Sequence, residues 1–495
     1  MRKVIEKQLK IGQVDIRDIP VDLQCRDEIP QVLLGLKAIY SNREVRDRVF
    51  SILSEITPKN VASDNGRPGM DLWKILVLGT IRLNCNWDYD KIHDIANNHK
   101  VIREFMGHTI FEFDQRYGLQ TIKDNLLLPT PEVLDGINRV VVEHGHTIVG
   151  HRDDESLKGR CDSFVVETDV HFPTDINLLW DAIRKVIELI GKLCDEIGIT
   201  EWRQHRHLSD NVKKLFDKVR RLKHSTSKDE KKKALKARQV VEAHRAYIQL
   251  VENYLARARL TLAIINDTGM ANVALGMLIE RFMAHAERQI DQIRRRVIEG
   301  EKIAHSEKVF SLFEEYTEWI SKGKAGVPGE LGLKVCILED QYGFVLHHDV
   351  MEHRTDDQVA VPMVEAAKGK FPGLDGCSFD KGFHSPYNQR ELKRLLDHVV
   401  LPRKGGLSAE DREIEHSEPF VASRRKHAAV ESAINALENH GLDRCRDHGL
   451  QGFKRYVALA VLSRNIQIVG ALVRLKELKR IKRRQKNESA LRLVA

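Results

Sequence analysis

Three acidic residues that lie far apart in the sequence are the residues best suited to chemistry. Asp380 ends a short apolar stretch, CSFD, just where a helical pattern begins. Asp162 lies in a segment rich in β-branched and aromatic residues, CDSFVVETDVHF, and Glu431 lies in a later helical pattern. Unpaired carboxylates gathered at one place repel one another unless a cation is present. If the fold brings these three together, we expect a metal site.

The chemistry that such a cluster supports is phosphoryl transfer. Breaking a phosphodiester bond requires a neutralised phosphate and an activated oxygen nucleophile, and two divalent ions roughly 3.5–4 Å apart can supply both. Mg²⁺ prefers carboxylate oxygens and is completed by water and substrate phosphate, so a few Asp and Glu suffice. The expected cofactor is therefore two Mg²⁺ ions, with Mn²⁺ as a substitute, bound by Asp162, Asp380 and Glu431.

The elements that must position these acids can be predicted from periodicity and turn signals. The expected strands are 161–172, 331–340, 344–352, 376–380 and 398–404, and the helices among and after them are 357–371, 386–396 and 424–441. Without a long helical stretch after the first strand, the order is β-β-β-α-β-α-β-α. This is the order of a ribonuclease-H-like α/β domain, in which the first strand, the end of the fourth strand and the last helix converge.

The remaining regions are predicted to be mainly helical. Thr130 and Pro131 are expected to begin a helix that Gly145 ends. The helices before residue 150 could bind DNA as a helix-turn-helix or could be purely structural. The predicted divisions are a leader (1–45), a helical N-terminal domain assigned to DNA binding (46–150), a catalytic domain (151–177 and 323–470), a helical insertion (178–322) and a basic tail (471–495).

The charge of the chain is compatible with a polyanionic partner. The net charge is +8, with basic residues concentrated in residues 203–238 and 474–486. Such blocks are typical both of phosphate-backbone binding and of solvated helix faces. Individual basic residues near the predicted site that could contact DNA phosphates, or form structural ion pairs, are Lys381, Arg403, Lys404, Arg424 and Arg425.

The cellular compartment is predicted from what the sequence lacks. The seven cysteines include no CxxC pair, which favours reduced thiols in the cytoplasm. The first residues, MRKVIEKQLK, contain no apolar segment typical of a signal peptide, and no membrane span is expected. A cytoplasmic, nucleoid-associated protein is the resulting expectation.

Other acids and histidines compete for a functional role. Glu167 is an odd number of residues from Asp162 and shares no strand face with it, whereas Asp169 is a real competitor. Asp175 follows a Pro-Thr pair and is predicted to be a turn or cap residue. The histidine clusters at 144–151 and 347–353 are not favoured as metal sites.

Three stretches of the sequence resemble the DDE transposases of bacterial insertion sequences. They are DSFVVETDVHFPTDINLLWDA (162–182), SFDKGFHSPYNQREL (378–392) and HAAVESAINALENHGLDRCRDHGLQGFKRYVALAVLSRNI (427–466). The first resembles the block in which an Asp opens a strand ahead of a Pro-Thr-Asp turn, and this favours Asp162 over Asp169. The chain departs from the family pattern at Phe164, at His427 and Glu438, and in the position of its insertion, between the first and second acids.

The resemblance implies a function as well as a fold. It implies a catalytic set of Asp162, Asp380 and Glu431, with DNA as substrate: the terminal inverted repeats of an element, and target DNA. The chain would cleave the element ends and join the 3′-hydroxyls to the target, as a homodimer or larger assembly when two ends are synapsed. The alternatives from other classes are a catalytically silent DNA-binding regulator derived from a transposase, and a nuclease without strand transfer.

Overall fold

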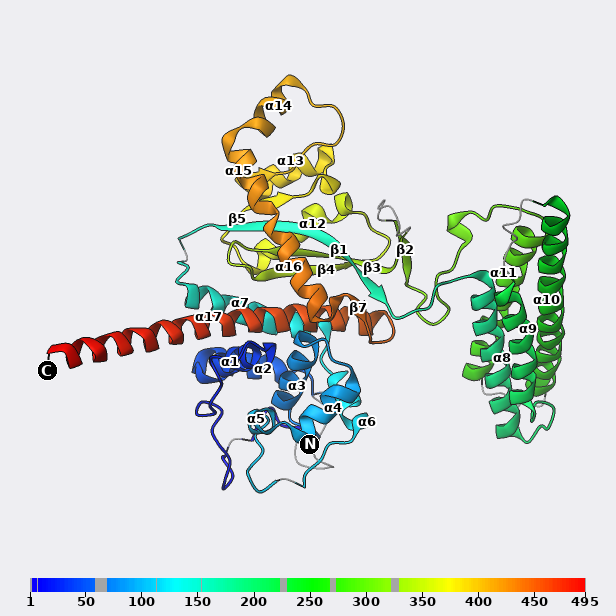
Figure 1. The fold of residues 1–495 in the computed structure, drawn as a ribbon, viewed down its shortest axis with the longest axis horizontal. Helices are drawn as coiled ribbons and strands as arrows, with labels where there is room; N and C mark the ends of the chain where they lie inside the picture. Colours follow the sequence, from blue (N-terminus) through cyan, green and yellow to red (C-terminus); the bar gives the residue numbers. More distant parts are fainter. Residues whose placement is uncertain are drawn as a thin grey trace. The chain divides into compact units, whose positions relative to one another are not determined.

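The chain folds into two compact units (Figure 1). The computed structural model describes residues 2–6, 8–57, 69–112, 114–152, 154–222, 229–267, 273–321 and 329–494. One unit is formed by residues 1–169 and 318–495, and the other by residues 170–317. The helical insertion predicted at 178–322 therefore corresponds to a separate unit that begins and ends a few residues earlier.

The first unit is an α/β structure built on a mixed sheet, in which the described residues form seven strands. The central strand is β1 (Leu157–Thr168), which lies between β3 and β5. Antiparallel pairing joins β1 to β3 (Glu330–Glu339), and β3 to both β4 (Val345–Met351) and β2 (Glu318–Ile320). Parallel pairing joins β1 to β5 (Leu374–Phe379) and β7 (Arg444–Cys445), and β5 to β6 (His398–Val400).

Strand β1 begins earlier than the sequence suggests. The predicted strand started at Cys161, but the observed strand starts at Leu157, whose side chain is buried beside β5. Gly159 allows this close packing, since a Cβ atom there would lie 2.9 Å from Leu338 Cδ2. Asp162 consequently lies in the middle of β1 and does not open it.

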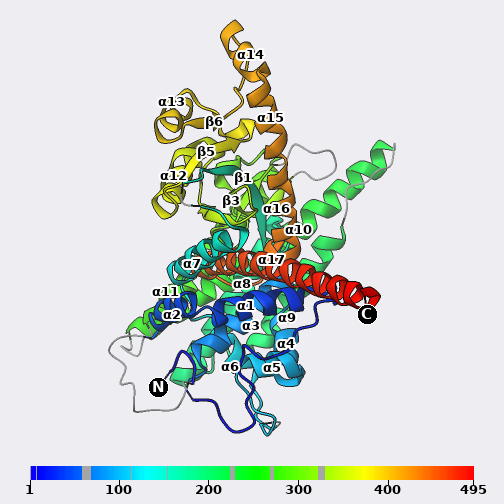
Figure 2. The same ribbon diagram turned by 90° about the vertical axis from the view of Figure 1, so that its left-hand side faces the viewer.

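Helices cover both faces of the sheet (Figure 2). On one face α12 packs against β3, β4 and β5, and on the other α15 packs against β5 and β6 while α16 packs against β1. The α-helices between β4 and β7 are α12 (Asp356–Lys370), α13 (Pro386–Leu395), α14 (Ala409–His416), α15 (Glu418–His427) and α16 (Ala429–Leu437). Because side chains alternate along a strand, neighbouring residues of β1 serve different faces. Ser163 bonds to Asp356 of α12, whereas Arg160 reaches the main chain of α15 at Lys426.

The N-terminal helices belong to the same unit as the sheet. The helices before β1 are α1 (Glu28–Ser41), α2 (Arg43–Ser54), α3 (Leu72–Asn84), α4 (Tyr89–Asn98), α5 (Lys100–Phe105), α6 (Leu119–Leu126) and α7 (Pro131–Val149). The long last helix, α17 (Leu450–Val494), packs against α1, α3, α7 and β4 (Figure 1). The regions predicted as a separate domain at 46–150 and a separate tail at 471–495 are thus joined to the sheet through one continuous helix.

Helix α17 combines a buried apolar part with an exposed basic end. Its segment Leu450–Asn487 is long and apolar enough to cross a membrane by length and composition, and 72% of its most apolar window is buried inside the protein. A mostly buried core helix passes the same test, so this helix alone is weak evidence for a membrane span. Beyond Lys479 the described side chains of α17 are exposed, and the helix runs away from the rest of its unit (Figure 1).

The predicted end of α7 at Gly145 is wrong, and packing explains the glycine instead. Thr130 caps the helix and Pro131 begins it, as predicted, but the helix continues to Val149 and ends at Gly150, which has a φ of 81°. A Cβ atom on Gly145 would lie 2.2 Å from Phe344 Cζ. Glycine is needed there because the Phe344 ring packs against the helix backbone.

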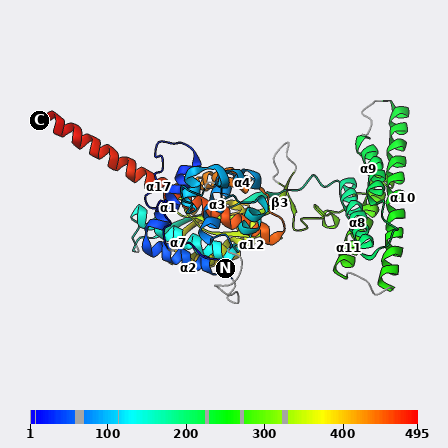
Figure 3. The same cartoon turned by 90° about the horizontal axis from the view of Figure 1, so that it is seen from below.

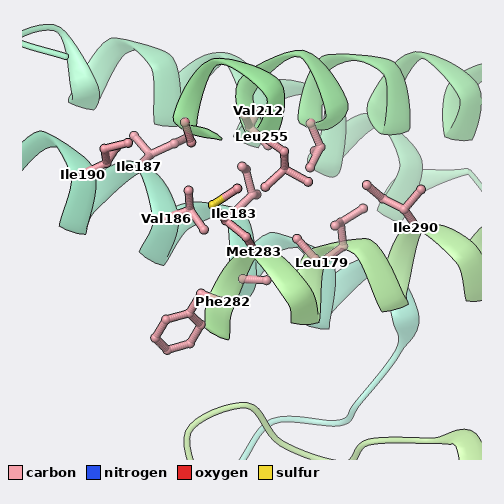
Figure 4. Packing of buried hydrophobic residues seen from close by; sticks show 14 of the residues in the cluster. Leu179, Ile183, Val186, Ile187, Ile190, Val212, Leu255, Phe282, Met283 and Ile290 are labelled. Carbon is pink, nitrogen blue, oxygen red and sulfur yellow. The ribbon is translucent and has the colours of Figure 1, made fainter. Parts of the chain in front are cut away.

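The second unit is a bundle of long helices, which lie side by side in Figure 3. Its α-helices are α8 (Asp175–Ile197), α9 (His205–Arg221), α10 (Glu230–Asp267) and α11 (Val273–Ile293). Aliphatic side chains from all four fill its core (Figure 4). Trp202 is fully buried in this core and donates a hydrogen bond from Nε1 to Thr261 Oγ1 at 3.0 Å. The bundle therefore has its own hydrophobic core, as an independently packed insertion requires.

Candidate functional site

Strand register brings Asp162 and Asp380 to the same place. In the parallel pairing of β1 with β5, Cys161 is opposite Phe379, and Asp162 and Asp380 are the next residues on the two chains. Neighbouring strands are about 4.8 Å apart, and residues in register point to the same face of a sheet. The fold therefore places side by side two acids that are far apart in the sequence.

Helix α16 carries the third predicted acid to this part of the unit. Its buried residues, Val430, Ala433 and Leu437, pack inward, and α16 contacts β1. Glu431 lies in the first turn of α16, and its side chain is exposed, as is that of Asp380. One continuous helix over 424–441 was predicted, whereas the structure has a break at Ala428 between α15 and α16.

The electrostatics of Asp162 link these three acids. Burial raises the pKa of Asp162 to about 6, against an opposing hydrogen bond from the Ser163 backbone N–H. The negative charges of Asp380 and Glu431 raise this pKa further. Like charges have this effect only when they lie close together, because screening weakens the interaction with distance. A nearby cation would relieve this repulsion.

A fourth acid, Asp356, was missed in the sequence. Its charge also raises the pKa of Asp162, but its carboxylate accepts hydrogen bonds from Ser163 Oγ at 2.6 Å and from Lys334 Nζ at 3.0 Å. Ser163 and Asp162 are adjacent in β1 and point to opposite faces. Asp356 therefore lies on the opposite face of β1 from Asp162, and its carboxylate is ion-paired with Lys334. Its position at the start of α12 was the only sequence signal, and it indicates no more than a helix terminus.

Gly382, in the turn that follows Asp380, packs against Asp356. A Cβ atom on Gly382 would lie 3.2 Å from Asp356 Oδ2. The 3-10 turn Lys381–Phe383 can therefore approach α12 closely, with Phe383 buried beneath it. The glycine in the DKGF stretch is thus explained by packing next to the candidate site.

His427 lies on the acid face, beside β5. Its ring Nδ1 is 3.0 Å from Ser378 Oγ, and its Nε2 is buried without a hydrogen-bond partner. Burial lowers the pKa of His427, in opposition to the attraction of Asp380 and Glu431. His427 is therefore a histidine of lowered pKa that contacts Ser378 on the face that carries the acids.

The competing acids near Asp162 have other partners. Glu167 forms an ion pair with Arg444 at 3.0 Å, and Asp169 lies 3.7 Å from the same guanidinium group. Asp169 follows the end of β1. Asp175 is in the first turn of α8, which Thr174 caps, and it pairs with Arg296 at 2.8 Å. The geometry favours Asp162 over these alternatives.

The predicted DNA-contacting residues divide into paired and available cations. Arg403 forms an ion pair with Asp411, and Lys404 Nζ donates to the carbonyl of Gly382 at 2.6 Å. Lys381, at the tip of the turn after Asp380, is exposed. Arg424 and Arg425, in the last turn of α15, are also exposed. Of the five predicted residues, these last three are exposed and have no ion pair with a described residue.

The two histidine clusters have structural partners. His146 Nε2 lies 2.6 Å from the buried carboxylate of Asp340, and His151 Nδ1 lies 3.2 Å from the hydroxyl of Tyr342. Burial lowers the pKa of His347 to about 3 and that of His348 to about 4. These histidines are core and packing residues.

The carboxylates suit a cation whose coordination shell is completed by water and by substrate phosphate. Within the described residues, no group of three or more His, Cys, Asp and Glu side chains is placed to hold a metal ion by itself. Mg²⁺ is usually bound through one or two carboxylates, several waters and substrate phosphates. The adjacent pair Asp162 and Asp380, whose repulsion a cation would relieve, fits this mode of binding, with Glu431 beside it.

Comparison with known proteins identifies no family for this chain. The chain has no match among protein-family models, among curated proteins or among solved structures.

Proposed function

We propose that this protein is a DDE-type DNA transposase. It binds the terminal inverted repeats of its element, cleaves the element ends and joins the 3′-hydroxyls to target DNA. The observation that carries the proposal is the register of β1 and β5, which sets Asp162 beside Asp380, with Glu431 arriving from α16. In this proposal the α/β unit is a ribonuclease-H-like catalytic domain.

The sheet topology supports this assignment of the fold. The strand order runs from β4 through β3, β1 and β5 to β6, with antiparallel pairing on one side of β1 and parallel pairing on the other. Helices α12, α13 and α15–α16 follow in the positions expected for the β-β-β-α-β-α-β-α order. The bundle and β2 interrupt this order between the first two core strands, β1 and β3.

The chain's own residues hold the reacting groups. Asp162 and Asp380 face the same edge of the site, and Glu431 supplies a third carboxylate from an exposed helix turn. Two Mg²⁺ ions, or Mn²⁺ as a substitute, would contribute charge neutralisation and a more acidic nucleophile when bound by these residues. Ser163 and Lys334 fix Asp356 behind β1, which keeps the strand in place without adding a free charge.

The reaction sequence balances without an external energy source. Water first attacks the phosphodiester at an element end, which breaks one P–O bond and leaves a 3′-hydroxyl. That hydroxyl then attacks a phosphodiester of the target, forming one P–O bond as another breaks and the leaving 3′-oxygen takes a proton. Each step exchanges one phosphate ester bond for another or for a bond to water, so positioning and charge are what the protein must supply.

DNA binding in this proposal uses exposed cations on several elements. Lys381 directly follows Asp380, Arg424 and Arg425 lie in the last turn of α15, and the exposed end of α17 carries a dense basic block. Contacts with phosphates supply affinity that falls steeply with salt. Two element ends must be held together for insertion, which implies at least a dimer during the reaction.

The experiment uses labelled fragments that carry the DNA flanking the coding sequence on each side, incubated with the full chain and Mg²⁺. Asp380→Asn should abolish strand cleavage and joining while retaining fragment binding. Asp397→Asn is the matched control. This exposed aspartate directly precedes β6, and its N–H bonds to Asp375 at the start of β5, whereas Asp380 follows the end of β5. Cleavage by Asp380→Asn at the unmodified rate would overturn the proposal. Cutting without joining would indicate a nuclease, and binding alone a DNA-binding regulator.

A further inference from the structure

A pocket lies next to the acid cluster on the same face of the sheet. It has a volume of about 450 Å³ and is bounded by the first part of β1, the middle of β5, β6, and α15 with the start of α16. Its lining includes Lys158, Arg160, Ser378, His398, Arg425 and Lys426. This volume is within the range of pockets that bind small organic groups.

Strand alternation makes the pocket continuous with the candidate catalytic site. Lys158, Arg160 and Asp162 are alternate residues of β1 and share a face. On the neighbouring chain, Ser378 pairs with Arg160 and lies two residues before Asp380. A ligand that enters the pocket therefore lies along the same two strands that lead to the acids.

The pocket is strongly basic. Four of its lining residues are Lys or Arg, and no Asp or Glu lines it. Arg160 is engaged already, since its Nε is 3.0 Å from Glu339 and its Nη2 donates to the carbonyl of Asp340. Lys158, Arg425 and Lys426 form no ion pair with any described residue, and all three are exposed. Three cations without counter-ions beside a cluster of acids suit a ligand that carries phosphate.

The rest of the lining suits the uncharged part of a nucleotide. Val400 and Ala429 contribute apolar surface, and the exposed His398 lies at the edge. Gly376 keeps the floor open, because a Cβ atom there would lie 3.2 Å from His398 Cβ and 3.7 Å from Lys158 Cγ. Histidine rings can stack on unpaired bases, and such stacking is combined with basic grooves in single-strand binding.

We propose that this pocket binds an unpaired nucleotide of the DNA strand next to the phosphodiester held at the acid cluster. Lys158, Arg425 and Lys426 hold its phosphates, while its sugar and base lie over Gly376 against His398 and Val400. A pocket of this size admits one strand and excludes a duplex, so the DNA must be unpaired locally at the site. The inference rests on the proposed function for the identity of the adjacent phosphodiester, but it makes its own prediction about binding.

The experiment compares two fluorescein-labelled DNA duplexes of the same sequence, one blunt and one with three unpaired nucleotides at the end. Binding to the full chain is measured by fluorescence anisotropy in EDTA, so that cleavage plays no part. The unmodified protein should prefer the duplex with the unpaired end. Lys158→Glu should weaken binding of that duplex by about tenfold, with less than about a twofold effect on the blunt duplex.

Three further variants and one competitor sharpen the test. Lys426→Glu should behave like Lys158→Glu, and Gly376→Val should reduce the preference by filling the floor while leaving every charge in place. Lys302→Glu is the matched control, because it makes the same charge reversal at an exposed lysine of the other unit. A free deoxynucleoside monophosphate and the unlabelled duplex with the unpaired end are compared as competitors. If both compete equally well, the pocket is a mononucleotide site and the proposal is overturned.

The outcomes separate this inference from the proposed function. No preference for the unpaired end, or equal losses for both duplexes, would overturn the pocket assignment even if the protein cleaves DNA. A pocket-dependent preference in a protein that fails to cut any tested DNA would support the pocket and count against the transposase. Thermal unfolding of each variant, measured alongside, identifies losses that come from misfolding, and Gly376→Ala then replaces the valine variant.

Discussion

Asp162 and Asp380 are the first residues after the paired positions Cys161 and Phe379 on two neighbouring parallel strands. The relationship depends on the register alone, since a shift of one residue would place the two side chains on opposite faces. The same register aligns Arg160 with Ser378, and thus joins the acid cluster to the basic pocket.

Replacement of Asp162 should stabilise the protein at neutral and alkaline pH. Its folded-state pKa of about 6 is above the ordinary value of an aspartate. The folded state therefore binds the proton more tightly, and ionisation above pH 6 costs the fold about 1–3 kcal/mol that is absent below pH 4. Asp162→Asn keeps an acceptor for the Ser163 N–H and removes this cost. Urea unfolding should show a gain at pH 8 that shrinks towards pH 4.5.

Mg²⁺ should affect the stability of the unmodified protein and of Asp162→Asn differently. Mg²⁺ is expected to raise the unfolding midpoint of the unmodified protein at pH 8 and to leave Asp162→Asn nearly unchanged, because binding to the folded state stabilises it. A variant that is less stable at pH 8, or that gains as much from Mg²⁺, would contradict the role of Asp162 in a repulsive, cation-binding cluster.

Asp356→Asn should reduce stability without the loss of chemistry expected for Asp380→Asn. The change weakens the bonds to Ser163 Oγ and leaves Lys334 without its carboxylate partner, at a cost of about 1–3 kcal/mol. We expect a lower thermal midpoint but metal-dependent cleavage that persists at a temperature where the variant is folded. Complete loss of cleavage in a folded Asp356→Asn protein would place this residue among the catalytic acids.

The crossing of α1 and α17 should tolerate no side chain at Gly470. A Cβ atom there would lie 1.8 Å from the backbone oxygen of Gln31, and backbone cannot move aside as a flexible side chain can. Gly470→Ala should therefore lower stability by about 3 kcal/mol or more. Gly136→Ala in α7 is the control, because its Cβ would meet only Ile52 at 3.4 Å. Chemical denaturation should separate them by sign, with Gly136→Ala neutral or slightly stabilising.

The exposed end of α17 should contribute DNA affinity and little stability. Lys479, Lys482, Arg483 and Arg484 are exposed on a part of the helix that extends away from the rest of its unit (Figure 1). Replacing all four with glutamine should leave the thermal midpoint unchanged. The slope of log affinity against log salt should fall by up to about 4, since each phosphate contact contributes about 0.9. An unchanged slope would show that this helix end does not contact DNA.

Some of the fold could be predicted because its signals are local. The positions of β3, β4, α12 and α13 agree with the apolar patterns, caps and turns within a residue or two. The start of β1 at Leu157 was missed because Leu157 and Gly159 are explained by contacts with β5 and β3, distant in the sequence. Gly145 was mistaken for a helix end for the same reason, since its partner is Phe344.

The candidate site shows the same limit. The types of residue at 162, 380 and 431 could be recognised in the sequence, and with them the chemistry that carboxylates support. The role of Asp356 could not, because it depends on which face of β1 carries Ser163 and on where Lys334 lies in β3. The basic pocket was hidden for a similar reason, since its cations come from β1 and α15, more than two hundred residues apart.

The sequence by itself determined the strand and helix pattern, the residues that can act as acids and the basic character of the exposed segments. Periodicity, capping and side-chain chemistry act over a few residues, so they can be read locally. Only the tertiary structure decided that Asp162 adjoins Asp380, that Asp356 lies behind β1, and that Lys158 and Lys426 share one pocket. These relationships are set by inter-strand register and by helix packing across the sheet, which depend on contacts between residues distant in the chain.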